Sequence, residues 1–361
     1  SPTPSIILCY CTEILIMSDL KIIIWGFPLN THTHSFIHAS FYKAFKHLGY
    51  ETYWFHSGNY PDPSVFDYSN CLFFSEGYAD DKIPQNETST YFIHNTIEPS
   101  KYVEKGLRLV DIRFNVKEIN DLNYSFVLDK KKLKKIDSVT FYDPNASDDA
   151  LADAKKKGIS GYEAIYMMWA TNLVPKEFNF EDRFFERENK FYFVGTIGGS
   201  PALEMKKVVD TLNQLNIPFI NINPWQTPLD FEQNMDLLKK SIISLDVRGS
   251  DAYHTNSDGK IEINGKPVTG GNHKKIGYIP CRLLKQISYG RMPGTNSTAV
   301  KDLLGEYVIY NDDESQLPID CLNFEKNPDY DLVYEGMKHI QKNHTFINRA
   351  KAILKVFNEE I

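Results

Sequence analysis

The sequence has little cysteine and no surplus of positive charge. Its 361 residues include five cysteines, which are scattered and form no C-x-x-C pair. That distribution excludes a cysteine-rich zinc module and fits a reducing compartment. Lysine and arginine number 40 against 47 aspartates and glutamates, so the formal net charge is −7. A general nucleic-acid-binding protein would carry a basic excess, so we expect no nucleic-acid partner.

Long hydrophobic runs are also missing. No stretch approaches the roughly 18 consecutive apolar residues that a membrane-spanning helix needs. Residues 1–16 are apolar, but they are too short to cross a bilayer and lack the basic start of a signal peptide. Because Met17 opens a stretch typical of a protein start, we interpret residues 1–16 as a non-native or upstream extension. We expect a cytoplasmic protein.

Short apolar runs instead alternate with amphipathic helical patterns. Residues 21–25 form an apolar run that ends at Gly26, as a buried strand would. Residues 35–48 then carry apolar side chains at helical spacing, and residues 51–55 predict the next strand. This strand–helix–strand unit predicts an α/β fold with an open parallel sheet. A second series of the same kind begins with a predicted strand at residues 190–194.

The length of the chain predicts two domains, since a domain has about 150 residues. We divide the chain into a first Rossmann-like domain (17–176), a polar linker (177–189), a second Rossmann-like domain (190–340) and a C-terminal helix (341–361). Residues 330–358 read as continuous helix. Within the second domain, Asn264-Gly265 between short β-like runs predicts a hairpin.

The stretch 273–297 carries the strongest functional signal. Pro280 at the start, apolar residues at helical spacing and Gly290 at the end predict a helix of about ten residues. Arg282 and Lys285 are three residues apart, so they share one face near the helix N-terminus. Free backbone N–H groups, a guanidinium and an ammonium favour a diphosphate ligand. The alternative is an ordinary solvated helix face.

Other predicted loops follow strands of the second series. In open α/β sheets, ligands bind outside the carboxyl ends of the strands. The loop 195–200 contains Thr196 and Gly198, and its backbone N–H groups could approach an anion, although such loops are often only tight turns. Tyr278 lies just ahead of the central helix.

Arg248 follows a predicted apolar strand at residues 242–247. At that position its guanidinium would point into the same crevice as Arg282 and Lys285. Its alternative is a surface salt bridge with Asp246 or Asp251. Three converging cations would neutralise the charge that grows on a departing diphosphate without a bound metal.

Two segments resemble a known family. The sequence PCRLLKQISYGRMPGTNS, residues 280–297, resembles the donor-binding helix of nucleotide-sugar glycosyltransferases with the GT-B fold, near those of the group 1 or spore-maturation type. Leu284, Gly290 and the strand leading to residues 295–297 match the family's frame. Lys285 replaces an acidic residue that usually holds ribose or sugar hydroxyls, which favours phosphate contact instead. The segment IYMMWATNLVP, residues 165–175, resembles the element ahead of the family's domain crossover.

The resemblance implies a two-domain GT-B fold with a cleft between the domains and a last helix that crosses back to the first. It implies metal-independent, cofactor-free transfer of a sugar from a nucleotide-diphosphate sugar to a hydroxyl of a glycan, a lipid-linked glycan or a small molecule. Peripheral membrane association is implied by the resemblance alone. The implied donor contacts are Thr196, Gly198, Arg248, Tyr278, Arg282, Lys285, Thr295, Asn296 and Ser297.

A histidine-rich segment follows the first predicted strand. His32, His34 and His38 lie in the loop and the first helical turn, where relatives place a catalytic base or acceptor contacts. Histidine suits removal of a proton from an attacking hydroxyl. We predict His34 as the base, with His94, which follows another strand, as the second candidate or a structural residue. His34 and His38 are also four apart, but no nearby Glu or Cys completes a zinc pattern, so we expect no metal.

Two further function classes stay open. A GT-B-like protein that binds a nucleotide sugar or glycan without turnover is one, and a nucleotide-sugar epimerase is the other. A phosphorylase-like enzyme lacks a recognisable cofactor-binding lysine here. The sequence leaves the donor sugar, its base, the acceptor, the stereochemical outcome and the oligomeric state undetermined.

Overall fold

The structure is a computed structural model of the whole chain. It describes residues 19–29, 33–113, 140–141, 163–197, 202–249, 261–263, 266–268, 273–274 and 277–358. Three segments whose sequence indicates a strand (125–128), a basic run (130–135) and a polar helix (148–157) lie outside these residues, as does Gly198.

The first group of elements is built on a seven-stranded sheet in the order β2-β1-β3-β4-β5-β7-β6. All neighbours are parallel except β6 and β7. The bounds are β1 (Lys21–Gly26), β2 (Glu51–His56), β3 (Cys71–Glu76), β4 (Thr90–His94), β5 (Arg108–Arg113), β6 (Thr140–Phe141) and β7 (Glu163–Met167), with helices α1 (Thr33–His47), α2 (Ser100–Val103) and α10 (Phe346–Phe357). The predicted α/β class with an open, mostly parallel sheet is therefore confirmed.

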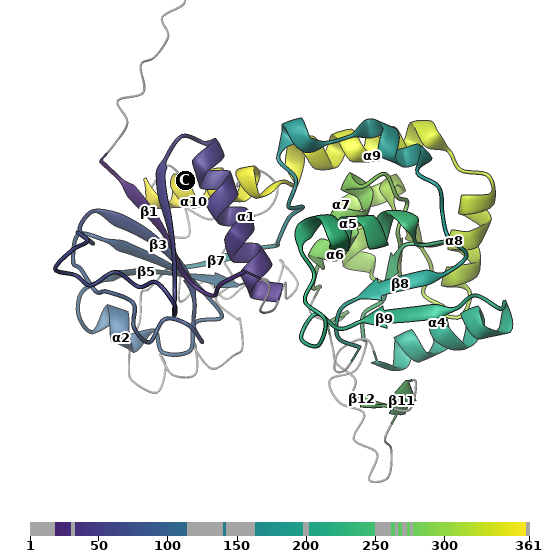
Figure 1. Cartoon of the computed structure of the whole chain (residues 1–361), viewed down its shortest axis with the longest axis horizontal. Helices are drawn as coiled ribbons and strands as arrows, with labels where there is room; N and C mark the ends of the chain where they lie inside the picture. Colours follow the sequence, from purple (N-terminus) through teal and green to yellow (C-terminus); the bar gives the residue numbers. More distant parts are fainter. Residues whose placement is uncertain are drawn as a thin grey trace, which may run out of the picture.

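The apolar runs of this sheet are buried on both faces. Ile22 and Ile24 pack in one core cluster with residues of α1 and α10. Ile23 and Trp25 point to the other face and join a cluster that includes Tyr102 of α2. Strand side chains alternate between the faces, so a continuous apolar run is what a sheet covered on both sides requires. Figure 1 shows α10 reaching back to the sheet from the far end of the chain.

The second group of elements contains two small parallel sheets. β8 pairs with β9, and β10, β13 and β14 form the second sheet in that order. The bounds are β8 (Phe191–Val194), β9 (Phe219–Ile222), β10 (Leu245–Asp246), β13 (Gly294–Thr295), β14 (Ile309–Tyr310), α4 (Ala202–Gln214), α5 (Phe231–Lys240), α6 (Cys281–Ser288), α7 (Thr298–Leu304), α8 (Leu317–Lys326) and α9 (Tyr330–Asn343). The 3-10 helices among the described residues are η4 (Pro175–Glu177), η5 (Phe180–Phe184) and η6 (Gly305–Tyr307).

The predicted hairpin is present as an antiparallel pair, β11 (Ile261–Ile263) and β12 (Lys266–Val268). Two other expectations are corrected. The predicted strand 242–247 is reduced to the two residues of β10. The tail is two helices, because Thr345 starts a new one: its backbone N–H donates to Asn348 Oδ1 (2.9 Å), and Asn348 N–H donates to its hydroxyl (3.4 Å). This reciprocal capping box ends α9 and begins α10.

The chain passes between the two groups twice, and Arg349 of α10 joins the two passages. Its guanidinium is fully buried and donates to the carbonyls of Met168 (2.9 Å) and Trp169 (3.1 Å) on the first passage. It also donates to the carbonyl of Asn343 (3.0 Å) on the second. Three backbone acceptors satisfy a charge that would be costly to bury alone. Among the described helices, none has the length and apolarity to span a membrane.

We predict that His344 makes the protein less stable in mild acid. His344 is 2% exposed, and its Nδ1 lies 3.2 Å from Nη2 of Arg349, which can only donate. Burial, and then the charge of Arg349, lowers the pKa of His344 well below 6.5. The unfolded chain therefore takes up this proton first as the pH falls below about 6.5, which costs the folded state up to about 1.4 kcal/mol per pH unit.

The measurement is urea denaturation of the wild type and His344→Gln between about pH 7 and pH 5. The wild type should lose more stability than the variant over this window. Equal losses in the two proteins would contradict the prediction. Comparing slopes rather than absolute values removes any pH-independent cost of the substitution.

Candidate functional site

A cavity of about 270 Å³ lies between α1 of the first group and the carboxyl ends of β8 and β10 in the second. It approaches the size range of small-ligand sites, which begins near 300 Å³. The lining brings together five of the residues proposed from the sequence, and α1 and α10 contribute from the other side. The lining residues are Phe36, Ile37, Ser40, Val194, Gly195, Thr196, Pro224, Leu229, Asn234, Leu238, Arg248, Tyr278, Pro280, Cys281, Arg282, Lys285 and Phe346.

Helix α6 presents its N-terminus to this cavity. Pro280 is its N-cap (φ −76°, ψ 135°), so the helix begins one residue later than predicted and has eight residues. The predicted stop at Gly290 is confirmed by its φ of +77°, a conformation that suits glycine. A Cβ on Gly290 would lie 2.4 Å from the backbone nitrogen of Arg183, so close packing also demands glycine there.

The Asp246 carboxylate organises the charges of the cavity. It is 1% exposed and accepts from Arg248 through Nε (2.5 Å) and Nη2 (2.9 Å). Arg282 Nη1 also donates to Asp246, and its Nη2 donates to the carbonyl of Val194 (2.7 Å). The ion pair offered as the alternative for Arg248 is thus present, but it is buried, and Arg248 lines the cavity as well.

Two guanidiniums against one carboxylate leave the cavity wall electropositive. Burial is the largest influence on the pKa of Arg248 and would lower it, but Asp246 and Tyr278 together outweigh burial, so the pKa is raised. The Arg248 guanidinium stacks over Tyr278, 5.0 Å from the ring centre, and burial raises the pKa of Tyr278 to about 12. Burial, and then the charge of Arg248, lowers the pKa of neighbouring His273 to about 4. Lys285 lines the same cavity, and its ammonium group pairs with no carboxylate among the described residues.

Gly195 makes room for Arg282. Its φ is +150°, which L-residues rarely adopt, and a Cβ there would lie 2.4 Å from Arg282 Nη2. The guanidinium of Arg282 also lies 4.0 Å from the ring centre of Phe193 in β8. The absence of a side chain at Gly195 therefore lets the Arg282 guanidinium pack against the loop backbone. The same loop places Thr196 in the lining of the cavity. Gly198 lies outside the described residues.

Thr295, Asn296 and Ser297 are fully buried and do not line the cavity. Asn296 Oδ1 accepts from the backbone N–H of Arg248 (2.8 Å), and its Nδ2 donates to the carbonyl of Arg248 (3.0 Å). It also donates to Glu314 (2.9 Å). Asn296 thus positions the Arg248 backbone from behind. The predicted contacts of residues 295–297 with ribose or phosphate stay a prediction.

Sequence reasoning missed the residues that hold the C-terminal end of α6. The Thr171 hydroxyl lies 2.7 Å from the Ser288 hydroxyl, and the Tyr289 hydroxyl donates to Asn172 Oδ1. These bonds tie the first passage of the chain to the helix that carries Arg282. The sequence signal for these contacts was the polar pair Thr171 and Asn172 inside the largely apolar run 165–175.

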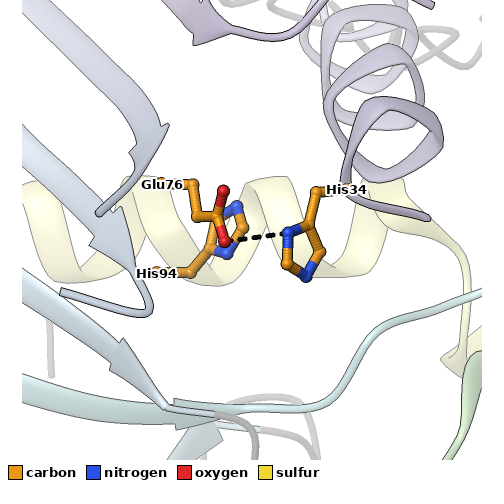
Figure 2. A group of neighbouring side chains, drawn as sticks. All are labelled: His34, Glu76 and His94. Atoms are coloured by element: carbon orange, nitrogen blue, oxygen red, sulfur yellow. Dashed lines mark ion pairs between the residues drawn. The ribbon is translucent and has the colours of Figure 1, made fainter. Parts of the chain in front are cut away.

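A second cluster joins His34, Glu76 and His94 at the carboxyl ends of two central strands of the seven-stranded sheet (Figure 2). His34 lies in the first turn of α1, and the other two are the last residues of β3 and β4. His34 Nδ1 lies 2.8 Å from Glu76 Oε1. His94 Nε2 lies 2.9 Å from Nε2 of buried His38. The sequence pattern paired His34 with His38, whereas the structure brings His34 to Glu76 and His94.

The chain order explains why these residues meet. From β1 the chain runs through α1 to β2 on one side, whereas β3 pairs with β1 on its other side. The crevice at such a reversal, outside the carboxyl ends of the strands, is where open α/β sheets bind ligands. His32, the third histidine of the segment, lies outside the described residues.

The backbone around Glu76 is shaped for this cluster. Asn95 has φ +49°, and its side-chain amide donates to Glu76 Oε1 (2.9 Å). The N–H of Gly77 donates to the carbonyl of His94 (2.9 Å), and a Cβ on Gly77 would lie 2.0 Å from the Asn95 carbonyl oxygen. Glycine at 77 and a left-handed asparagine at 95 therefore allow the two strand ends to converge. The sequence signal for Glu76 was a carboxylate ending an apolar strand.

Comparisons with known proteins give information on the fold but none on the chemistry. No protein-family model matches the chain, and no curated protein matches it significantly in sequence. The N-terminal domain of trehalose-6-phosphate phosphatase from Candida albicans is similar over 95% of this chain and 97% of its own, with 8% identity and a TM-score of 0.50. An alpha-glucosyltransferase solved with UDP and a 13-mer DNA containing an HMU base is similar over 90% and 95%, with 8% identity and a TM-score of 0.45. At this identity the first likeness shows a shared fold alone, and the second is too distant to support an argument.

We predict that Asp246→Asn is strongly destabilising. The change leaves Arg248 and Arg282, which are 12% and 19% exposed, without their buried counter-charge. Breaking such a pair typically costs about 3–5 kcal/mol of unfolding free energy. The matched control is Asp312→Asn, since Asp312 pairs with Lys274 but is 68% exposed and should cost less than about 1 kcal/mol. Urea denaturation of both variants makes the comparison, and similar small losses would contradict the prediction.

Proposed function

We propose that the protein is a GT-B-type glycosyltransferase that moves a sugar from a nucleotide-diphosphate sugar to a hydroxyl acceptor. In this proposal residues 190–340 bind the donor, residues 17–176 bind the acceptor, and the cavity is the donor site. The observation that carries it is the meeting of Arg248, Arg282 and Lys285 in a single cavity beside α6. The resemblance of residues 280–297 to a donor-binding helix supports the same assignment.

The chemistry of the transfer matches this wall. Negative charge grows on the diphosphate as the bond to the sugar breaks, and fixed donors aimed at that charge lower the barrier. Asp246 holds two guanidiniums in fixed orientations. The Lys285 ammonium pairs with no carboxylate among the described residues, so its positive charge is available to the phosphates. The aromatic and apolar part of the lining, including Tyr278 and Leu238, suits the base or sugar.

The acceptor hydroxyl needs a proton acceptor, and His34 fits this role. Its side chain is 28% exposed, whereas His94 is fully buried, so His34 is the histidine that a substrate can reach. Its contact with Glu76 orients the ring and would stabilise the imidazolium that forms. Phe36, Ile37 and Ser40 line the donor cavity from the same helix, so α1 joins the base to the donor site.

A GT-B-like binding protein without turnover is the second candidate. The observation that favours it is Lys285, which occupies the place of the family's acidic residue. Release of nucleoside diphosphate from a donor separates the two candidates, because binding alone releases none.

We predict that Lys285→Ala weakens nucleotide-diphosphate binding without disturbing the fold. The wild type should show a thermal shift with at least one nucleoside diphosphate, since a ligand at about 100 times its Kd adds about 2.7 kcal/mol to stability. Loss of one charged phosphate contact should weaken binding about tenfold, or about 1.4 kcal/mol. Arg282→Ala should lose more, because it also breaks the pair with Asp246.

Lys206→Ala is the matched control, since Lys206 lies on α4, is about half exposed and pairs with Asp210. It should keep the full response to the nucleotide. If no nucleoside diphosphate shifts the wild type at millimolar concentration, the donor-site assignment is wrong.

We predict that His34→Gln slows donor turnover about 10²–10⁴-fold, the usual contribution of a positioned general base. Glu76→Gln should slow it less, because the base remains. Thermal shifts with nucleoside diphosphate should be unchanged in both variants, since neither residue lines the donor cavity. The readout is nucleoside diphosphate release in the presence of a metal chelator, and full activity of His34→Gln would rule out this base.

A further inference from the structure

The His34, Glu76 and His94 cluster has the donor set of a transition-metal site. One ligand atom from each residue lies within 4.8 Å of the others. Two imidazoles and one carboxylate, with positions left for water or substrate, form a well-known ligand set for zinc and for iron(II). The residues come from α1, β3 and β4, so the packed sheet holds two of the ligands rigidly.

The burial of Glu76 is the second observation. This residue is 1% exposed, yet among the described residues no lysine or arginine pairs with it. Its Oε1 lies 2.8 Å from His34 Nδ1 and accepts a hydrogen bond from the Asn95 amide (2.9 Å). A buried carboxylate is costly without a cation, and histidine offers only a conditional one. A divalent ion between Glu76 and the imidazoles would supply a permanent positive charge.

Hydrogen bonds and contacts from neighbouring residues also hold the three side chains in place, as metal ligands require. Ligating side chains are commonly oriented by hydrogen bonds from outside the coordination shell. Asn95 donates to the Glu76 carboxylate, and its φ of +49° places its side chain for that bond. His38, fully buried, makes a 2.9 Å contact with His94. Figure 2 shows the three ligand side chains converging from the helix and the strand ends.

We propose that His34, Glu76 and His94 bind one divalent transition-metal ion of the zinc type. Two nitrogen ligands favour such an ion over magnesium or calcium, which prefer oxygen. His34, 28% exposed, borders solvent and provides the route of entry. The site does not depend on the proposed glycosyl transfer. If that function holds, the ion and the acceptor compete for His34, so the metal inhibits transfer.

The test is titration of the metal-free full chain with Zn²⁺ in competition with a chromophoric chelator, repeated with Co²⁺ to record its ligand-field spectrum. The variants are His34→Gln and Glu76→Gln. Glutamine has the shape of Glu76, and His34 is partly exposed, so we expect both variants to fold. His47→Gln is the matched control, an exposed histidine at the other end of α1.

We expect one equivalent of metal in the wild type, at least tenfold weaker binding in both variants, and less than a twofold change in His47→Gln. The cobalt spectrum should lack the charge-transfer band of thiolate ligands, which separates this site from the cysteines. The proposal is overturned by no binding at about 100 μM metal, by unchanged affinity in either variant, or by a thiolate band. Nucleotide thermal shifts are independent of this result, so the two proposals can fail separately.

Discussion

The arrangement of the molecule depends on one buried guanidinium. Arg349 sits where the chain crosses between the two groups of elements, and it donates to carbonyls of both passages. A buried arginine requires these acceptors, so neither passage can shift without leaving a charge unsatisfied. The same region ties Thr171 and Asn172 to the end of α6. The cavity beside α6 depends on this crossing, because its lining comes from α1 and α10 on one side and from α6 on the other.

The candidate sites obey one geometric rule and differ in their charge. Both lie at the carboxyl ends of parallel strands, where the connections diverge and leave a crevice. The cavity beside α6 is electropositive, because Asp246 holds two guanidiniums and Lys285 adds a third cation. The cluster at β3 and β4 instead has a buried carboxylate among imidazoles. An anionic donor suits the first, and a base or a cation suits the second.

Local signals in the sequence predicted several elements but few of the contacts. Apolar runs predicted β1 and β8, and the Pro280-to-Gly290 pattern predicted α6 within a residue or two. The tail was wrongly predicted as one helix, because the capping box of Thr345 and Asn348 competes with an uninterrupted apolar pattern. Asp246 was considered only as a surface partner, since its burial between two arginines depends on the packing of three segments.

What the sequence by itself determined is the α/β class, the positions of several strands and the cationic face of α6. Those features follow from periodicity, turn residues and helix spacing, which act over a few neighbouring residues. Only the tertiary structure decided that His34 meets Glu76 and His94, and that residues 295–297 lie behind Arg248 rather than in the cavity. These contacts join positions far apart in the chain, and they are set by strand order and core packing, which no local pattern encodes.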